Sequence, residues 1–332
     1  MTKKPAATSA QKESTDAPER PIRAVLYDAA GHDEDIDPSA VPVKALRDDQ
    51  LLWVDGPLDA LRASKHVPAD IRAALGNYTG TCGLEILDPV YRVTVPSSHE
   101  VGNGKSLGFI VGKAWLVTVT DPRPAFLDRF VDTDLGETLN GRMTPSALAV
   151  ALLTELLDSY RSELSNIARQ VDKLDEAILT FREKRTPLQT LAVLRRKVSL
   201  LRSILDETGI TLHAMVRPDF LTHIDAADHG YFEGLSRAHE RVEDMVARAR
   251  DIIVGSFDLY TTRVAQETNQ LVKVLTIVTV VTGIIGAVAG IFGMNFDTPF
   301  AHTGTNGFII VTAAMALSAA TFVAVAIWRK WL

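Results

Sequence analysis

The pattern of apolar and polar residues divides the chain into parts with different periodicities. From Ile22 to about Asn140, short apolar runs alternate with turn residues, which is typical of strands in a small domain. From about Pro145, apolar residues recur every three or four positions, which indicates helices that pack along one face. From Val274 onward, two long stretches contain no Asp, Glu, Lys or Arg. Residues 1–21 show none of these patterns, and we expect them to form a disordered tail.

The N-terminal pattern predicts five strands and a helix. The strands are expected at 24–27, 51–54, 91–95, 107–111 and 115–119, and the helix at Ala69–Leu75. The last two strands flank Gly112-Lys113-Ala114, which predicts a hairpin. We therefore expect a cytosolic α+β domain over residues 22–140 with a partly antiparallel sheet. The sequence contains no GxGxxG, Walker or GxSxG motif that would indicate a nucleotide-binding or hydrolase domain.

Two heptad seams follow this domain and predict long, coiled-coil helices over residues 141–268. Pro187 separates the seams, and the second ends near Gly209. The seam residues are Leu153, Leu157, Tyr160, Leu164, Ile167, Val171, Leu174 and Ile178, followed by Leu191, Leu194, Val198, Leu201 and Leu205. No proline occurs between Pro218 and Pro299, so one helix is predicted from about Tyr231 to Phe292. Such a helix would be ~90 Å long and would couple the domain to the last part of the chain.

The two uncharged stretches predict a transmembrane hairpin over residues 269–332. The spans are expected at about 271–292 and 308–328, each long enough to cross a bilayer. The linker between them has no Lys or Arg, whereas Arg263 precedes the first span, Lys273 lies at its start, and Arg329 and Lys330 follow the second span. By the positive-inside rule, both termini are expected in the cytoplasm of a multi-pass protein of the cell (inner) membrane.

Composition narrows the class of protein further. The 332 residues are 46% hydrophobic and 23% charged, which excludes a disordered or collagen-like chain. A net charge of −6 gives no sign of nucleic-acid binding, and the single cysteine, Cys82, excludes an internal disulfide framework. No nucleophile–base arrangement is evident in the sequence. We therefore expect neither an enzyme nor a cofactor, and partners limited to membrane lipid and further copies of the chain.

One face of the first predicted span carries small and hydroxyl side chains. Steps of three and four residues from Asn269 reach Val272, Thr276, Thr279, Gly283, Gly286 and Gly290. This stripe fits helix–helix packing, because Gly286 and Gly290 form a GxxxG motif. It equally fits the lining of a water-filled pore. One chain with two spans cannot enclose a pore, so the second interpretation requires an oligomer.

The same stripe continues backwards into the predicted stalk, where three aspartates recur at seven-residue spacing. Asp244, Asp251 and Asp258 would form a solvated face on a single helix. In a ring of helices they would form stacked carboxylate rings that concentrate cations. A separate acidic cluster, His32, Asp33, Glu34, Asp35 and Asp37, fits a metal sensor, but the sequence favours a solvated loop because nothing fixes its geometry.

A Gly293-Met294-Asn295 motif directly follows the first span. Backbone carbonyls and an Asn amide oxygen are hard oxygen ligands that suit hydrated Mg²⁺, although Gly-x-Asn after a helix is also a common cap. Together with the segment 269–276 and the terminal Lys330-Trp331-Leu332, this motif resembles the CorA-type family of divalent-cation transporters. The resemblance covers about Ile22 to the C-terminus and is strongest over residues 255–332.

The resemblance implies a funnel-shaped homopentamer whose long helix lines the pore. It implies passage of Mg²⁺, often with Co²⁺ or Ni²⁺, and a gate closed by intracellular metal. Gly293, Met294 and Asn295 would form the outer selectivity filter, and Asn269 would lie at the cytosolic end of the pore. Asp251 and Asp258 would face the interior of the funnel.

The chain also departs from the family pattern. Val272, Gly283 and Gly286 stand near positions where the family often has Met, Met and Thr, which predicts a wider or displaced hydrophobic gate. The outer loop has Thr298-Pro299-Phe300 in place of Met-Pro-Glu and so lacks a carboxylate.

A further departure concerns regulation. The family's regulatory aspartate, expected soon after a Tyr-Phe pair, is absent after Tyr231-Phe232, where Glu233 is the candidate substitute. Two alternatives remain open: a Zn²⁺ transporter of the same architecture, and a membrane-anchored coiled-coil sensor that does not conduct.

Overall fold

The computed structural model describes residues 22–29, 33–37, 46–96, 106–134, 143–180, 187–294 and 304–329. The chain divides into two compact units, Met1–Arg169 with Val193–Asp251 and Gln170–Ala192 with Ile252–Leu332. Each boundary between the units falls inside a long helix. The ranges 22–140, 141–268 and 269–332 remain a subdivision predicted from the sequence.

The first unit contains a seven-stranded mixed sheet in the order β2-β1-β3-β7-β6-β5-β4. Its strands are β1 (Arg23–Asp28), β2 (Glu34–Asp35), β3 (Gln50–Gly56), β4 (Gly83–Leu87), β5 (Val90–Pro96), β6 (Ser106–Val111) and β7 (Trp115–Val119). Only β3 and β7 pair in parallel among these strands; the other pairs are antiparallel. All five predicted strands are present, and the sheet is partly antiparallel as predicted. β2 and β4 were not predicted, because β2 has two residues and β4 is an edge strand with exposed apolar side chains.

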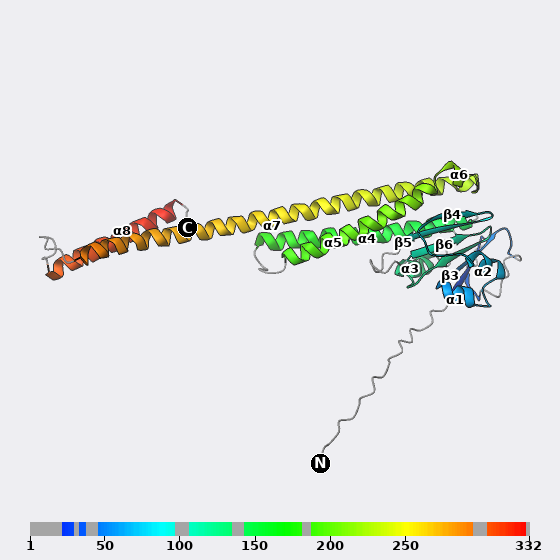
Figure 1. Ribbon diagram of the computed structural model, residues 1–332, viewed down its shortest axis with the longest axis horizontal. Helices are drawn as coiled ribbons and strands as arrows, with labels where there is room; N and C mark the ends of the chain where they lie inside the picture. Colours follow the sequence, from blue (N-terminus) through cyan, green and yellow to red (C-terminus); the bar gives the residue numbers. More distant parts are fainter. Residues whose placement is uncertain are drawn as a thin grey trace, which may run out of the picture. The chain divides into compact units, whose positions relative to one another are not determined.

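Two short helices, α1 (Leu58–Ala63) and α2 (Ala69–Leu75), cover one face of the sheet (Figure 1). α2 coincides with the helix predicted from the sequence. The core beneath them joins Leu61 and Ile71 of the helices to Leu52, Ile110 and Val117 of the strands, all fully buried. Burial of apolar surface stabilises this layer by about 25 cal/mol for each Å² removed from water.

The predicted hairpin between β6 and β7 is confirmed. The Gly112 amide donates to the Trp115 carbonyl at 2.9 Å, and Ile110 pairs with Val117 across the two strands. A Cβ atom at Gly112 would lie 2.4 Å from Cε2 of Trp115, so only glycine allows this indole to fold over the turn.

The other face of the sheet contacts α3 (Ala125–Asp134) and the first-unit parts of α4 (Pro145–Thr180) and α5 (Pro187–Ala214). Trp53 of β3 packs edge-on against Phe130 of α3 at a ring-centroid distance of 6.1 Å. The Tyr160 hydroxyl of α4 donates to the Pro96 carbonyl at 3.4 Å. Helices therefore cover both faces of the sheet, as Figure 1 shows.

Every residue of the two predicted heptad seams is buried, so both seams are confirmed. Beyond α5, the chain passes through α6 (Pro218–Leu221) and the 3₁₀ helix η2 (Ala226–Asp228) into α7 (His229–Phe292). α7 is one unbroken helix of 64 residues and begins two residues before the predicted start. Its own buried seam consists of Phe232, Leu235, His239, Val242, Val246, Ala249 and Ile253.

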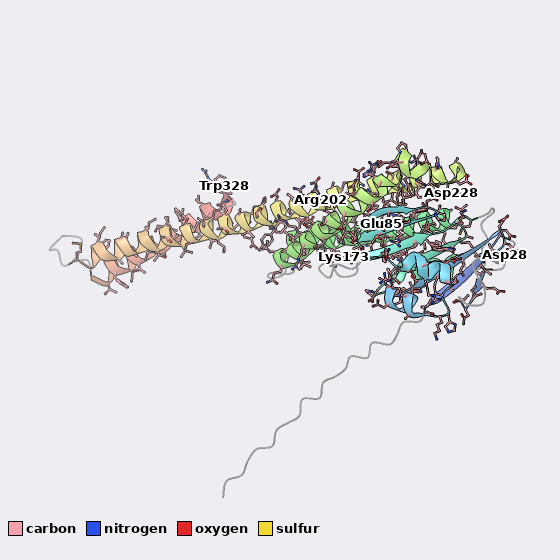
Figure 2. All side chains as sticks on the ribbon, turned by 45° about the vertical axis from the view of Figure 1, so that its right-hand side comes forward. Asp28, Glu85, Lys173, Arg202, Asp228 and Trp328 are labelled. Carbon is pink, nitrogen blue, oxygen red and sulfur yellow. The ribbon has the colours of Figure 1, made fainter. Side chains whose placement is uncertain are left out.

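The second unit contains the C-terminal part of α7 and α8 (Gly304–Trp328), which has 25 residues. Both helices are long and apolar enough to cross a membrane. Large apolar side chains stand exposed along them, including Leu271 at 71% and Leu317 at 70%. Trp328, at the end of α8, is 81% exposed (Figure 2), which suits a residue at a membrane–water interface. Such extensive apolar exposure is unfavourable in water but is expected in lipid.

Candidate functional site

The three aspartates of the predicted stripe lie on the exposed side of α7. Asp251 is two residues from Ala249 and two from Ile253, both buried, so it lies about 160–200° around the helix from the seam. Asp244 has the same relationship to the seam residues Val242 and Val246. Among the described residues, no ion pair joins Asp244, Asp251 or Asp258 to a basic side chain. Their charges are therefore available to solvent, to ions or to another copy of the chain.

The stripe continues along the apolar part of α7, where all seven of its members are exposed. They are Asn269, Val272, Thr276, Thr279, Gly283, Gly286 and Gly290. The hydroxyl of Thr276 donates to the Val272 carbonyl and that of Thr279 to the Leu275 carbonyl, both at 2.8 Å. Because these protons stay within the helix, the hydroxyl oxygens present lone pairs to their surroundings. This face can accept hydrogen bonds from water.

The glycines of the stripe have no packing role that the described part of this chain reveals. A Cβ atom built at Gly283, Gly286 or Gly290 meets no atom within 4 Å beyond the neighbouring helix backbone. Contact between α7 and α8 of one chain therefore does not require glycine here. Packing through the GxxxG motif would have to involve another copy of the chain, and so both interpretations of the stripe now imply self-association.

The Gly293-Met294-Asn295 motif begins where α7 ends. The Gly293 amide donates to the Ala289 carbonyl at 2.9 Å and the Met294 amide to the Ile291 carbonyl at 3.3 Å, which closes the last turn. Met294 is 54% exposed. Asn295, the predicted amide ligand, lies outside the described residues.

Among the other predicted metal ligands, Glu233 and two residues of the acidic cluster already interact with protein groups. Glu233 is exposed, and its Oε2 lies 3.5 Å from Nη1 of Arg237 one turn further along α7. In the acidic cluster, Asp35 accepts from Arg23 at 3.0 Å and Asp33 accepts from the Asp28 amide at 3.0 Å. Within the described ranges, no group of three or more His, Cys, Asp or Glu side chains could hold a metal ion. His32 lies outside these ranges.

A buried carboxylate that sequence analysis missed lies at the ends of β3 and β7. Asp55 is 3% exposed and accepts hydrogen bonds from Arg123 at 2.6 Å and Thr120 at 3.2 Å, as well as from Thr118. Burial raises the pKa of Asp55, while Arg123 and the threonine hydroxyls oppose the shift. The sequence offered one signal for this residue, namely that the charged Asp55 directly follows the apolar run 51–54. Because protein groups surround the carboxylate, we assign Asp55 a structural role in joining β3, β7 and the start of α3.

These features define a class: membrane proteins in which one helix runs unbroken from a folded α/β domain into an apolar hairpin. The family model described as CorA-like Mg²⁺ transporter protein matches residues 89–328. The chain therefore belongs to the CorA-like Mg²⁺ transporter family. This is a family of transporters rather than enzymes, in agreement with the expectation from the sequence.

Two curated relatives of this chain are both named cobalt/magnesium transport protein CorA. The chain is 32% identical over 187 residues to the cobalt/magnesium transport protein CorA of Thermotoga maritima, covering 56% of this chain and 52% of the relative. It is 23% identical over 172 residues to the protein of that name from Methanocaldococcus jannaschii, covering 52% and 54%. The chain thus matches about half the length of these relatives.

Solved structures share the fold. The complete CorA magnesium transporter from Methanocaldococcus jannaschii matches with a TM-score of 0.70 and 20% identity, covering 93% of this chain and 98% of that one. The cytoplasmic domain of ZntB from Vibrio parahaemolyticus matches with a TM-score of 0.54 and 9% identity, covering 74% and 99%. The predicted fold class, an α+β domain followed by long helices and a two-helix apolar hairpin, is confirmed.

Proposed function

We propose that this protein is a divalent-cation channel or transporter whose principal ion is Mg²⁺, with Co²⁺ and Ni²⁺ as further ions. One observation carries the proposal: α7 is unbroken and its polar stripe is exposed along its whole length, with Asp244 and Asp251 on the side opposite the buried seam. The stripe changes from carboxylates in the stalk to hydroxyls and glycines in the apolar part, and rings of carboxylates suit a path for cations. The names of the two CorA relatives support the choice of Mg²⁺ and Co²⁺.

The proposed assembly is a homopentamer in the cell (inner) membrane, with α7 of each copy around a central pore and both termini in the cytoplasm. Asn269, Val272, Thr276, Thr279, Gly283, Gly286 and Gly290 would line the pore. The membrane potential would drive influx, since two charges moving through 100 mV gain about 4.6 kcal/mol, at ~2.3 kcal/mol per charge. No cofactor is required for this process.

Selectivity would arise at Gly293, Met294 and Asn295. Mg²⁺ gives up its water reluctantly, so a filter that hydrogen-bonds its hydration shell costs less than one that strips it. Five Asn295 amides around the axis would offer acceptor oxygens to that shell. Met294 is 54% exposed at the end of α7, so a neighbouring copy or an ion can approach this residue.

Regulation would use the funnel carboxylates. Asp244, Asp251 and Asp258 would each form a ring of like charges, and a bound divalent ion would relieve their repulsion. Glu233 is the second candidate, although its exposed ion pair with Arg237 shows that it has a competing partner.

Ion flux into proteoliposomes tests the proposal. The purified protein should carry Mg²⁺, Co²⁺ and Ni²⁺ in response to an inside-negative potential, with no need for a pH gradient. Zn²⁺ flux that depends on a pH gradient, without Mg²⁺ flux, would favour the zinc-transporter alternative. The absence of flux for all four ions from an assembled protein would favour the non-conducting sensor.

A further inference from the structure

A cavity of about 550 Å³ lies within the second unit, apart from the polar stripe. Ile178 near the end of α4 and Pro187 at the start of α5 form one wall. The other wall is α7, through positions between Tyr260 and Val274. The volume is in the range typical of small-molecule sites.

The cavity occupies the side of α7 that faces away from the proposed pore. Glu267 and Leu271 line it, and each is two residues from Asn269, which places them about 200° around the helix from the stripe. Leu271 is also the first residue of the predicted membrane span. The cavity therefore straddles the level at which α7 enters the bilayer.

The charged and amide side chains of the α7 lining precede its exposed aliphatic end, although Tyr260 and Val264 also belong to the lining. Arg263 and Glu267 lie one helical turn apart on the side of the folded domain, and Gln270 follows them. Nη1 of Arg263 donates to Oε1 of Gln266 at 3.2 Å, so the guanidinium extends along α7 toward the span. Beyond Gln270 the lining is aliphatic, with Leu271 and Val274 exposed at 71% and 41%. A charged end next to an exposed aliphatic end matches an amphiphile at a membrane surface.

We propose that this cavity binds one glycerophospholipid with a zwitterionic, primary-amine headgroup, the chemistry of phosphatidylethanolamine. The lipid phosphate would accept from Arg263 and Gln270, the ammonium would donate to Glu267, and an acyl chain would lie along Leu271 and Val274. An anionic headgroup would meet the Glu267 carboxylate without a cation to offer it. A choline headgroup has no N–H donor for that carboxylate and would lose a charge-assisted hydrogen bond.

Lipid retention by the assembled, full-length protein tests the proposal. The protein is reconstituted in nanodiscs of equal parts phosphatidylethanolamine, phosphatidylcholine and phosphatidylglycerol, released into mild detergent, and its bound lipids are counted by native mass spectrometry. Phosphatidylethanolamine should be retained about tenfold over phosphatidylcholine, as expected for one charge-assisted hydrogen bond. Glu267→Gln should abolish this preference, and Arg263→Gln should lower retention of every phospholipid.

Glu240→Gln is the matched control, because Glu240 is an exposed carboxylate of α7 outside the cavity. Its lipid profile should equal that of the unmodified protein. Equal retention of the two zwitterionic lipids, or a preference unchanged in Glu267→Gln, would overturn the proposal. The proposal would also be overturned by a preference that is lost on neutralising Arg182, Lys184 and Arg185, which belong to the segment between α4 and α5 that is outside the described residues, but kept in Glu267→Gln. The readout requires no transport, so its result is independent of whether the protein conducts ions.

Discussion

Asp251 and Ile253 of α7 are two residues apart but lie on opposite sides of the helix: Ile253 is 1% exposed in the buried seam, and Asp251 faces outward. The same relationship holds for Asp244 and Val246 one heptad earlier. The seam holds α7 against its own chain, so the carboxylates are left for contacts outside the chain. This arrangement is the physical basis for placing them in a funnel shared by several copies.

Changing Asp251 and Asp258 together to Asn should weaken inhibition by Mg²⁺ on the domain side of the membrane. Without the carboxylate rings, a bound ion no longer relieves repulsion, so the closed state loses its advantage over the open one. The half-inhibiting Mg²⁺ concentration should rise by about tenfold, within the usual range of such coupling. Flux measured against internal Mg²⁺ in proteoliposomes gives this value.

The matched control for that pair is the acidic cluster, with Asp33 and Asp35 changed to Asn. Both carboxylates already serve contacts of the β1–β2 region, so inhibition should stay as in the unmodified protein. If this control shifts the inhibition curve and the funnel variant does not, the metal sensor lies in the N-terminal domain.

Asn295→Ala should reduce Mg²⁺ uptake by about tenfold or more while the oligomer still forms. A turn at the end of α7 needs only the backbone, whereas a filter for the hydrated ion needs the amide oxygen of Asn295. Loss of a hydrogen bond to a charged species costs about 1.5–3 kcal/mol, which corresponds to a reduction of about tenfold or more. Uptake by the variant, compared at equal amounts of assembled protein, provides the measurement. Normal uptake would show that the filter assignment is wrong.

The solubilised protein should be an oligomer, with about 181 kDa expected for five chains of 36.2 kDa. The outward carboxylates and the unfilled glycine stripe of α7 both lack partners within the described part of the chain. Light scattering with correction for detergent measures the protein mass. A protein of monomeric mass that conducts after reconstitution contradicts this prediction.

Cys82 should react slowly with alkylating reagents in the native protein. Burial, together with a hydrogen bond to Glu207 and its charge, raises the pKa of Cys82 to about 12. The thiol is therefore protonated at pH 8, and alkylation should be on the order of a thousandfold slower than in unfolded protein. The rate should rise with pH up to about 12 and should increase in Glu207→Gln. A native rate equal to the unfolded rate would contradict this environment for Cys82.

Most of the fold follows from periodic patterns in the sequence. The heptad seams of α4, α5 and α7 are long and regular, so many apolar residues at helical spacing predict each helix. α1 and β4 were not predicted from the sequence, for two different reasons. α1 has six residues and buries only Leu61. β4 lies at the sheet edge, pairs only with β5 and exposes Ile86 and Leu87, so it has no pattern of alternating buried positions.

The candidate site is predictable in part. The register of Asp244, Asp251 and Asp258 follows from seven-residue spacing, and their exposure agrees with it. The cavity next to Arg263 and Glu267 has no sequence signal, because its walls come from α4, α5 and α7, far apart in the chain. The proposed ring geometry of a filter at Gly293, Met294 and Asn295 would depend on contacts between copies, which the sequence of one chain does not encode as a local pattern.

Thiol accessibility along α7 tests the central claim, that the stripe lines an ion path, most directly. On a Cys82→Ala background, cysteine replaces either Thr279 of the stripe or Val281, about 200° away around the helix. Mg²⁺ flux is then measured before and after a membrane-impermeant, cationic thiol reagent. The account predicts that the reagent blocks most flux in Thr279→Cys and leaves Val281→Cys unchanged. Block of Val281→Cys with no effect on a conducting Thr279→Cys protein would contradict it.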